Sequence, residues 1–191
     1  MSTASAPTAT ETTLPVGTWT LDPVHSHAGF AVKHLAVATF RGSFEQFDAT
    51  LKVAEDGSAE LVGTVRADSI VVKDENLAGH LQAPDFFDAE RYPEIRFTSD
   101  SIRRDGDEVV ADGELTIKGN THPVEARGTI SGPAEIPGGA VKLGLTLDAV
   151  VDRTQFGLEF NAPLPRGGVA VANDVTLTVE LELAQADGTE A

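Results

Sequence analysis

Two histidines near the beginning of the chain have a spacing that suits metal binding. His25 and His27 are two residues apart, so on a β-strand their side chains lie on the same face. Two imidazoles on one face can bind zinc, which needs at least one more protein ligand. A third ligand would have to come from one of the remaining histidines, His34, His80 and His122, or from a carboxylate, and nothing in the sequence shows one nearby. We therefore predict no metal and no other cofactor, and expect a structural hydrogen bond for His25.

The same segment offers a nucleophile. Ser26 stands between the two histidines, but neighbours on a strand point to opposite faces, so neither imidazole reaches its hydroxyl easily. The chain contains no Gly-x-Ser-x-Gly elbow, no P-loop and no His-Glu-x-x-His motif. These observations favour a binding protein. The alternative is an enzyme that acts on a small apolar substrate inside the same fold.

Arg153 has two interpretations. It follows a long apolar strand pattern and precedes Phe156 and Gly157. Its guanidinium group either pairs with Asp152 or another carboxylate, or binds the oxygens of a polar or anionic head group. The ion pair is the more common arrangement, and the sequence does not decide between the two.

Apolar side chains are the more informative group. The chain has nine Phe against one Trp and one Tyr. Phe supplies apolar area without a polar atom that needs a partner, which suits a tunnel for a hydrocarbon, although each Phe is also compatible with ordinary core packing. From these residues and the apolar faces of the strands we predict a ligand-binding set of Phe30, Val32, Phe40, Phe44, Phe86, Phe97, Leu115, Leu143, Leu145, Arg153, Phe156 and Phe160.

The elements that position these side chains are predicted to be β-strands. Alternation of apolar and polar residues marks strands at 109–117, 124–130, 141–151 and 175–183, with weaker ones near 18–22, 26–34, 40–53, 59–71 and 94–103. Several long strands with short turns favour an all-β protein, a closed antiparallel barrel. Phe47 breaks the alternation that Phe40 and Phe44 set, which predicts a bulge or an outward Phe47.

A segment around 74–90 departs from the strand pattern. Asp74 is a suitable N-cap, and Leu77 and Leu81 lie one helical turn apart. Pro84 ends the helical pattern. The sequence therefore predicts a short helix over about 75–82, inserted between strands where it covers or plugs one end of the barrel.

Charge and hydropathy exclude several classes. Fourteen Lys and Arg against 30 Asp and Glu give a net charge of −16, and only Arg103 and Arg104 are adjacent, so nucleic acid and anionic membrane surfaces are disfavoured partners. No stretch approaches the roughly 20 apolar residues of a membrane-spanning helix. Residues 1–16 are predicted to be a disordered leader, 17–185 a single barrel domain and 186–191 a polar tail. The leader lacks the features of a secretory signal, which predicts a cytoplasmic protein, or a periplasmic or secreted one if a signal has been trimmed.

Four stretches of the sequence resemble the YceI-like family. They are GTWTLDPVHSHAGFAVKHLAVATFRGSFEQFDATL, NLAGHLQAPDFFDAERYPEIRFTS, VVADGELTIKGNTHPVEARGTI and VDRTQFGL. The resemblance implies a lipocalin-like, eight-stranded antiparallel β-barrel that binds, carries or sequesters a long apolar ligand, typically a polyisoprenoid or isoprenoid quinone. His80 matches a family position near the barrel mouth, where it either caps a ligand head group or ties the helix to the following loop. A homodimer is compatible with the resemblance.

Overall fold

Strands make up most of the structure, a computed structural model that describes residues 13–186. The strands are β1 (Gly17–Leu21), β2 (His27–His34), β3 (Ala38–Phe44), β4 (Phe47–Val53), β5 (Ala59–Arg66), β6 (Ile70–Val71), β7 (Glu94–Asp105), β8 (Glu108–Ile117), β9 (Asn120–Glu135), β10 (Val141–Asp152) and β11 (Val171–Gln185). The helical elements are α1 (Glu75–Gln82) and the 3₁₀ turns η1 (Ala67–Ser69) and η2 (Arg153–Phe156). No helix within residues 13–186 is long and apolar enough to cross a membrane.

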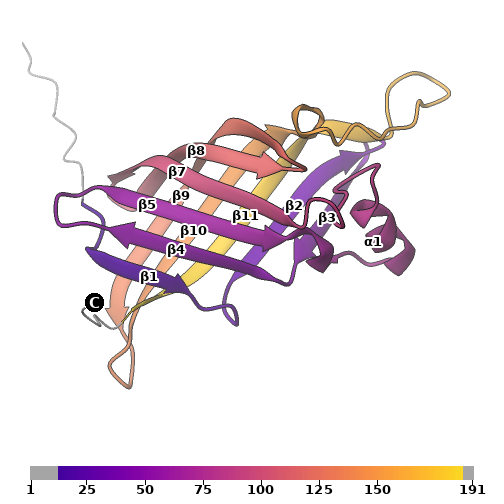
Figure 1. Cartoon of the computed structure of the whole chain (residues 1–191). Coiled ribbons are helices and arrows are strands. Elements are labelled where there is room, and N and C mark those ends of the chain that lie inside the picture. The colour runs from indigo at the N-terminus through magenta and orange to yellow at the C-terminus, as the bar shows by residue number, and fades with distance from the viewer. Residues whose placement is uncertain (1–12, 187–191) are drawn as a thin grey trace, which may run out of the picture.

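Strand β11 closes the sheet on itself. One edge of β11 pairs with β10, and the other pairs with β2 along one part and with β1 along another. Strands β1 and β2 therefore together occupy one strand position of the barrel. Strands β3 and β4 occupy the next position, because β3 pairs with β2 and β4 with β1. Together with β5, β7, β8, β9, β10 and β11 they form a closed eight-stranded antiparallel barrel (Figure 1), which confirms the predicted fold class.

The strand position shared by β3 and β4 is interrupted between Phe44 and Phe47, where the sequence predicted a bulge. The backbone bends at Glu45 and Gln46, whose amides donate to the Ser69 carbonyl (3.1 Å) and to the Ser69 hydroxyl (3.1 Å). Alternation restarts after the bend, so Phe44 and Phe47 both line the barrel interior. The expected irregularity between Phe44 and Phe47 is therefore present, as a break between two strands, and the alternative of an outward Phe47 was wrong because the break resets the alternation.

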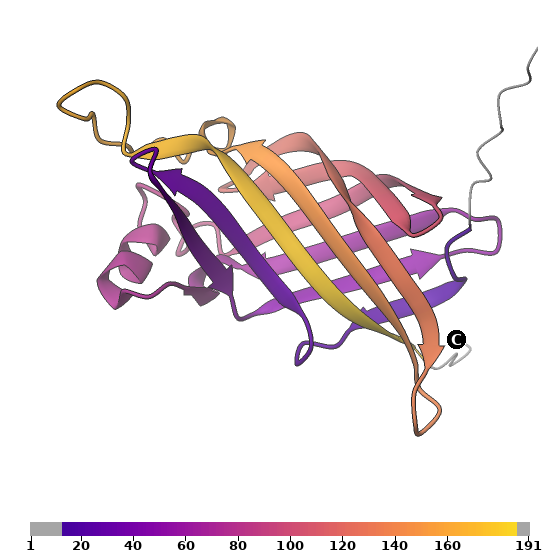
Figure 2. The same cartoon turned by 180° about the vertical axis from the view of Figure 1, so that it is seen from behind.

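The predicted helix is present as α1. The Asp74 carboxylate accepts a hydrogen bond from the Leu77 amide at 2.9 Å, which confirms Asp74 as the N-cap. Leu81 is buried against Ile70 and Phe86, so the helix is attached by its apolar side. Figures 1 and 2 place α1 at one end of the barrel, and both ends of the described chain at the opposite end. We call the end with α1 the mouth.

Side chains fill the barrel at the end opposite the mouth. The buried indole of Trp19 donates from Nε1 to the Pro15 carbonyl at 3.0 Å, and Leu14 is buried in the same core cluster. The folded part thus begins before Gly17, within the segment predicted to be a leader. Residues 1–12 and 187–191, the rest of that leader and most of the predicted tail, lie outside the described residues.

Candidate functional site

A cavity of about 630 Å³ lies between the filled end of the barrel and α1. This volume is within the range of roughly 300–1,000 Å³ that ligand sites occupy. Every Phe of the chain lines it: Phe30, Phe40, Phe44, Phe47, Phe86, Phe87, Phe97, Phe156 and Phe160. Among the described residues, the lining side chains with polar groups are those of His34, Thr39, Asp48, Thr64, His80 and Arg153. Because an ordered water needs two to four polar partners, such a lining favours an apolar occupant.

Packed aromatic rings form the cavity wall beneath α1. The Phe30 ring centroid lies 6.1 Å from that of Phe40 and 5.9 Å from that of Phe44. Phe44 in turn contacts Phe87 edge-on at 5.8 Å. Gly42 makes room for this cluster, since a Cβ atom at Gly42 would lie 2.5 Å from the Phe30 ring. The rings therefore join β2, β3 and the segment after α1 into one apolar surface.

His80 lies at the mouth between two aromatic rings. Its imidazole centroid is 5.1 Å from Phe86 and 5.0 Å from Phe160, and both contacts are edge-on. Its Nε2 atom is 3.8 Å from a carboxylate oxygen of the exposed Asp85. His80 thus ties α1 to the loop that follows it, and through Phe160 to the segment after η2. The same imidazole also lines the cavity, so the structure is compatible with both roles that the sequence left open.

Arg153 lines the cavity, and its guanidinium group donates hydrogen bonds to backbone carbonyls. Its Nε donates to the Ala172 carbonyl (2.8 Å), its Nη1 to the Leu158 and Phe160 carbonyls, and its Nη2 to the Val171 carbonyl (3.2 Å). Asp152 instead accepts from the Thr154 amide and hydroxyl. Among residues 13–186, Arg153 therefore forms no ion pair, which was the first of its two interpretations. Burial lowers the pKa of the Arg153 guanidinium, with an opposing effect of Asp152, but an arginine keeps its charge in proteins.

All but two of the predicted binding residues line the cavity. Those that do are Phe30, Val32, Phe40, Phe44, His80, Phe86, Phe97, Leu115, Arg153, Phe156 and Phe160. Leu143 and Leu145 do not line it but join the core cluster around Trp19. Their strand face is the one expected, since Leu147, Ala149 and Val151 on the same face do line the cavity. Alternation gives the direction of a side chain but not its depth along the barrel.

The inward face of β11 is the main part of the lining that the predicted set omits. It contributes Val175, Leu177, Val179 and Leu181. Their alternation with polar residues is visible in the sequence, so the signal was present. Phe47 was omitted for a different reason, because the face of the sheet on which its side chain lies depends on the break between β3 and β4.

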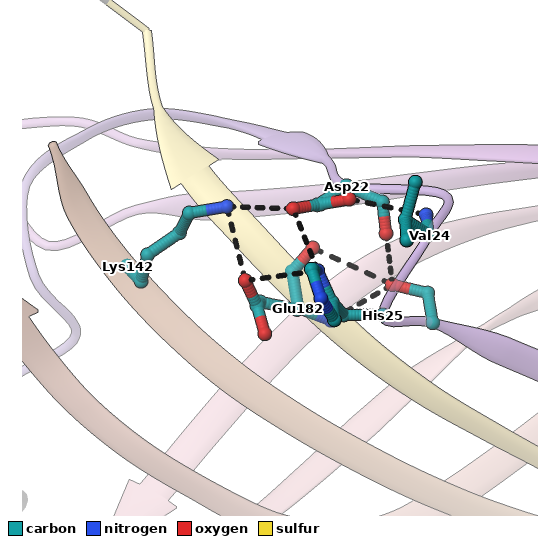
Figure 3. Close-up of polar contacts among 6 residues, drawn as sticks. Asp22, Val24, His25, Lys142 and Glu182 are labelled. Atoms are coloured by element: carbon teal, nitrogen blue, oxygen red, sulfur yellow. Dashed lines mark hydrogen bonds and ion pairs between the residues drawn. The ribbon is translucent and has the colours of Figure 1, made fainter. Parts of the chain in front are cut away.

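His25 joins a group of potential ligands with Asp22 and Glu182, and His27 is not part of that group among the described residues. His25 Nδ1 lies 3.1 Å from the Asp22 carboxylate and 3.7 Å from that of Glu182, at the end of the barrel opposite the mouth, which confirms the expected hydrogen bond. The Lys142 ammonium lies between the same carboxylates, 2.8 Å from Asp22 and 3.0 Å from Glu182 (Figure 3). The hydrogen bond from Lys142, followed by that with His25, holds the pKa of the Asp22 carboxyl well below its usual range.

A closed eight-stranded antiparallel barrel with an apolar cavity at one end is a lipocalin-like fold. Within it, the chain belongs to the YceI-like family, whose domain model matches residues 19–183. A UPF0312 protein from Staphylococcus aureus (strain USA300) is 32% identical over 170 residues, which cover 86% of this chain and 95% of that protein.

Two solved structures show the same fold. BcnA from Burkholderia cenocepacia has a TM-score of 0.71 at 21% identity, with 85% of this chain and 98% of that chain covered. A polyisoprenoid binding domain from Saccharophagus degradans has a TM-score of 0.63 at 12% identity, with 88% and 98% covered. At these identities the likeness concerns the fold.

Proposed function

We propose that this protein binds an isoprenoid-type lipid, a polyisoprenoid or an isoprenoid quinone, in the barrel cavity and carries or sequesters it. The observation that carries the proposal is the cavity lined by every Phe of the chain. A polyprenyl tail offers only hydrocarbon groups, and burial of apolar surface contributes about 25 cal/mol per Å² without any hydrogen bond. The name of the Saccharophagus degradans domain, which has this fold, supports the same ligand class.

The distribution of polar groups orients the ligand. The inner end of the cavity meets apolar residues of β10 and β11, such as Leu147 and Leu181, whereas His80 lies at the mouth. A buried polar group without a partner is costly, so a head group is stabilised at the mouth and a hydrocarbon tail further inside. We therefore infer that the tail enters first and that the head group lies near His80.

The structure adds no support to the enzymatic alternative. Among the described residues, the one group of three or more His, Asp or Glu side chains close enough to share a ligand is Asp22, His25 and Glu182, at the end of the barrel opposite the mouth. Arg153 donates its hydrogen bonds to backbone carbonyls. Binding thus explains the cavity, and the described residues give no separate reason for catalysis.

Extraction of bound lipid from two matched variants tests the proposal. Ala149 and Val150 are neighbours on β10, but Ala149 lines the cavity whereas Val150 is exposed on the outer wall. We expect an organic extract of freshly purified protein to contain a long-chain isoprenoid lipid near one-to-one stoichiometry by mass spectrometry. Ala149→Trp, which fills the cavity with an apolar ring, is expected to reduce this amount severalfold or more.

Val150→Trp is the control for that experiment and is expected to retain its lipid. Circular dichroism and thermal unfolding verify that both variants are folded. An extract without an isoprenoid lipid, combined with no uptake of added polyprenol by the purified protein, contradicts the proposed function. Equal lipid content in the two variants contradicts the cavity as the place of binding.

A further inference from the structure

Apolar side chains are exposed beside the mouth, on two adjoining segments. The first is the β2–β3 turn with its flanks, residues 33–41, and the second is the loop at residues 159–170. Val37 is 82% exposed, Val169 49%, Phe160 41% and Leu35 39%. We call these two segments the lip. Figures 1 and 2 show both projecting beyond the barrel wall at the same end as α1.

The lip is a connected structure. The Leu35 amide donates to the Ala170 carbonyl at 2.8 Å, which joins the turn to the loop. At the base of the loop, the Asn161 side chain donates to the Val171 carbonyl at 2.7 Å and accepts from the Val171 amide at 3.0 Å. Arg153 binds carbonyls on both sides of the loop. The exposed apolar side chains are thus held in place on a hydrogen-bonded base.

The charge of the lip differs in sign from that of the whole chain. Its segments contain Lys33, Arg41 and Arg166 but only one carboxylate, Glu159, in a chain with a net charge of −16. The three cations are exposed, and none has a carboxylate within ion-pair distance among the described residues. The segment that carries α1, residues 73–91, has the opposite balance, with Asp74, Glu75, Asp85, Asp88 and Glu90 against Lys73 and Arg91.

The cavity opens at the lip. His34, Ala38, Phe160, Ala170 and Val171 line the cavity and belong to the lip or directly adjoin it. A surface that covers the lip therefore also covers an entrance to the cavity. A ligand with a hydrocarbon tail that leaves a bilayer here passes from lipid to apolar side chains with little exposure to water.

We propose that the lip docks the mouth of the barrel onto the surface of an anionic lipid bilayer. The net charge of −16 disfavours such a surface for the molecule as a whole, and the lip is the exception because its own charge is positive. This inference rests on the proposed function, because an isoprenoid lipid resides in a membrane. Apolar side chains that enter the interface and cations that meet anionic head groups are the two contributions to such binding. The asymmetry of the mouth sets the orientation, with the lip against the lipid and the acidic segment of α1 turned away.

Vesicle binding by matched variants tests the docking surface. The full chain, stripped of lipid, is sedimented with phosphatidylcholine vesicles that contain or lack phosphatidylglycerol. Val37 in the lip and Val24 in the β1–β2 turn at the opposite end are 82% and 81% exposed, so Val37→Asp and Val24→Asp make the same change at the two ends. We expect Val37→Asp to weaken binding to phosphatidylglycerol vesicles about tenfold, and Val24→Asp to leave it unchanged.

A second pair isolates the electrostatic contribution. One Lys or Arg close to an anionic membrane is worth about fivefold in affinity, so Arg166→Glu is expected to weaken binding tenfold or more. Lys52→Glu changes the net charge equally but lies on β4, away from the lip, and is expected to have little effect. The contribution of the lip cations to vesicle binding is also expected to fall as the salt concentration is raised, because salt screens electrostatic attraction.

Several results overturn the proposal. They are no sedimentation of the unaltered protein with phosphatidylglycerol vesicles, equal effects of Val37→Asp and Val24→Asp, or a dimer in sedimentation velocity that Val37→Asp dissociates while vesicle binding persists. The last result assigns the lip to contact between two copies. Uptake of a fluorescent polyprenol delivered from cyclodextrin separates the two proposals, because uptake without docking refutes the lip alone, and docking without uptake refutes the cavity function alone.

Discussion

Asp22 makes the stability of the barrel depend on pH in the acidic range. It accepts hydrogen bonds from Lys142 and His25, and its carboxyl therefore has a pKa well below the ordinary value of 3.8. A carboxyl group whose pKa is lowered by folding stabilises the protein fully above the pKa of the unfolded chain. This stabilisation disappears as the pH falls through the window between the unfolded and folded values.

Removal of this carboxylate gives the first prediction. We expect Asp22→Asn to unfold at a lower urea concentration than the unaltered protein at about pH 5, and the difference to shrink below about pH 4. The fluorescence of Trp19, the one Trp of the chain and a buried one, reports the transition. Glu55→Gln, in the exposed β4–β5 turn, serves as the control. A difference for Asp22→Asn that stays constant or grows down to about pH 2 is incompatible with this assignment.

At the scale of the elements, a glycine on β9 leaves no room for a side chain beside β10. A Cβ atom at Gly128 would lie 1.8 Å from the Thr146 carbonyl oxygen of β10, so no side chain fits without separation of the two strands. Gly79 in α1 is the opposite case, since a Cβ atom there has no neighbour within 4 Å and its backbone is helical. Two glycines that look equivalent in sequence thus have opposite structural roles.

Alanine at these glycines is expected to change stability in opposite directions. Gly128→Ala should lower the free energy of unfolding by about 3 kcal/mol or more, since the strands must move apart. Gly79→Ala should raise it by about 0.5–1 kcal/mol, because alanine loses less backbone entropy in a helix. Urea unfolding of both variants measures the two changes. A destabilised Gly79→Ala or a neutral Gly128→Ala is inconsistent with the structure.

Local features of the molecule could be predicted from the sequence, and distances between remote segments could not. The N-cap at Asp74 and the inward faces of the strands follow from neighbouring residues. The depth of Leu143 in the barrel depends on which strands it faces, and the inward position of Phe47 depends on a bend fixed by Ser69. The position of Arg153 at the cavity was predicted, but its hydrogen-bond partners were not, because they are carbonyls of the loop at 158–172 and a backbone carbonyl has no sequence signature.

The two ends of the barrel differ in how their interior is filled. The end around Trp19 is packed with side chains, whereas the end beneath α1 keeps a cavity of about 630 Å³. An apolar cavity costs stability because its lining lacks packing partners, and a ligand that fills it restores those contacts. The barrel is therefore expected to gain stability from an apolar ligand in proportion to the cavity surface that the ligand covers.

Affinity as a function of chain length tests the central claim most directly. Delipidated protein is titrated with prenyl alcohols of increasing length, and the dissociation constant of each is measured. Each buried CH₂ group is worth about 0.8 kcal/mol, so we predict that affinity rises with every added isoprene unit until the cavity is filled and then levels off. Dissociation constants that do not change with chain length, or that are the same for Ala149→Trp, would contradict a cavity built to hold a hydrocarbon chain.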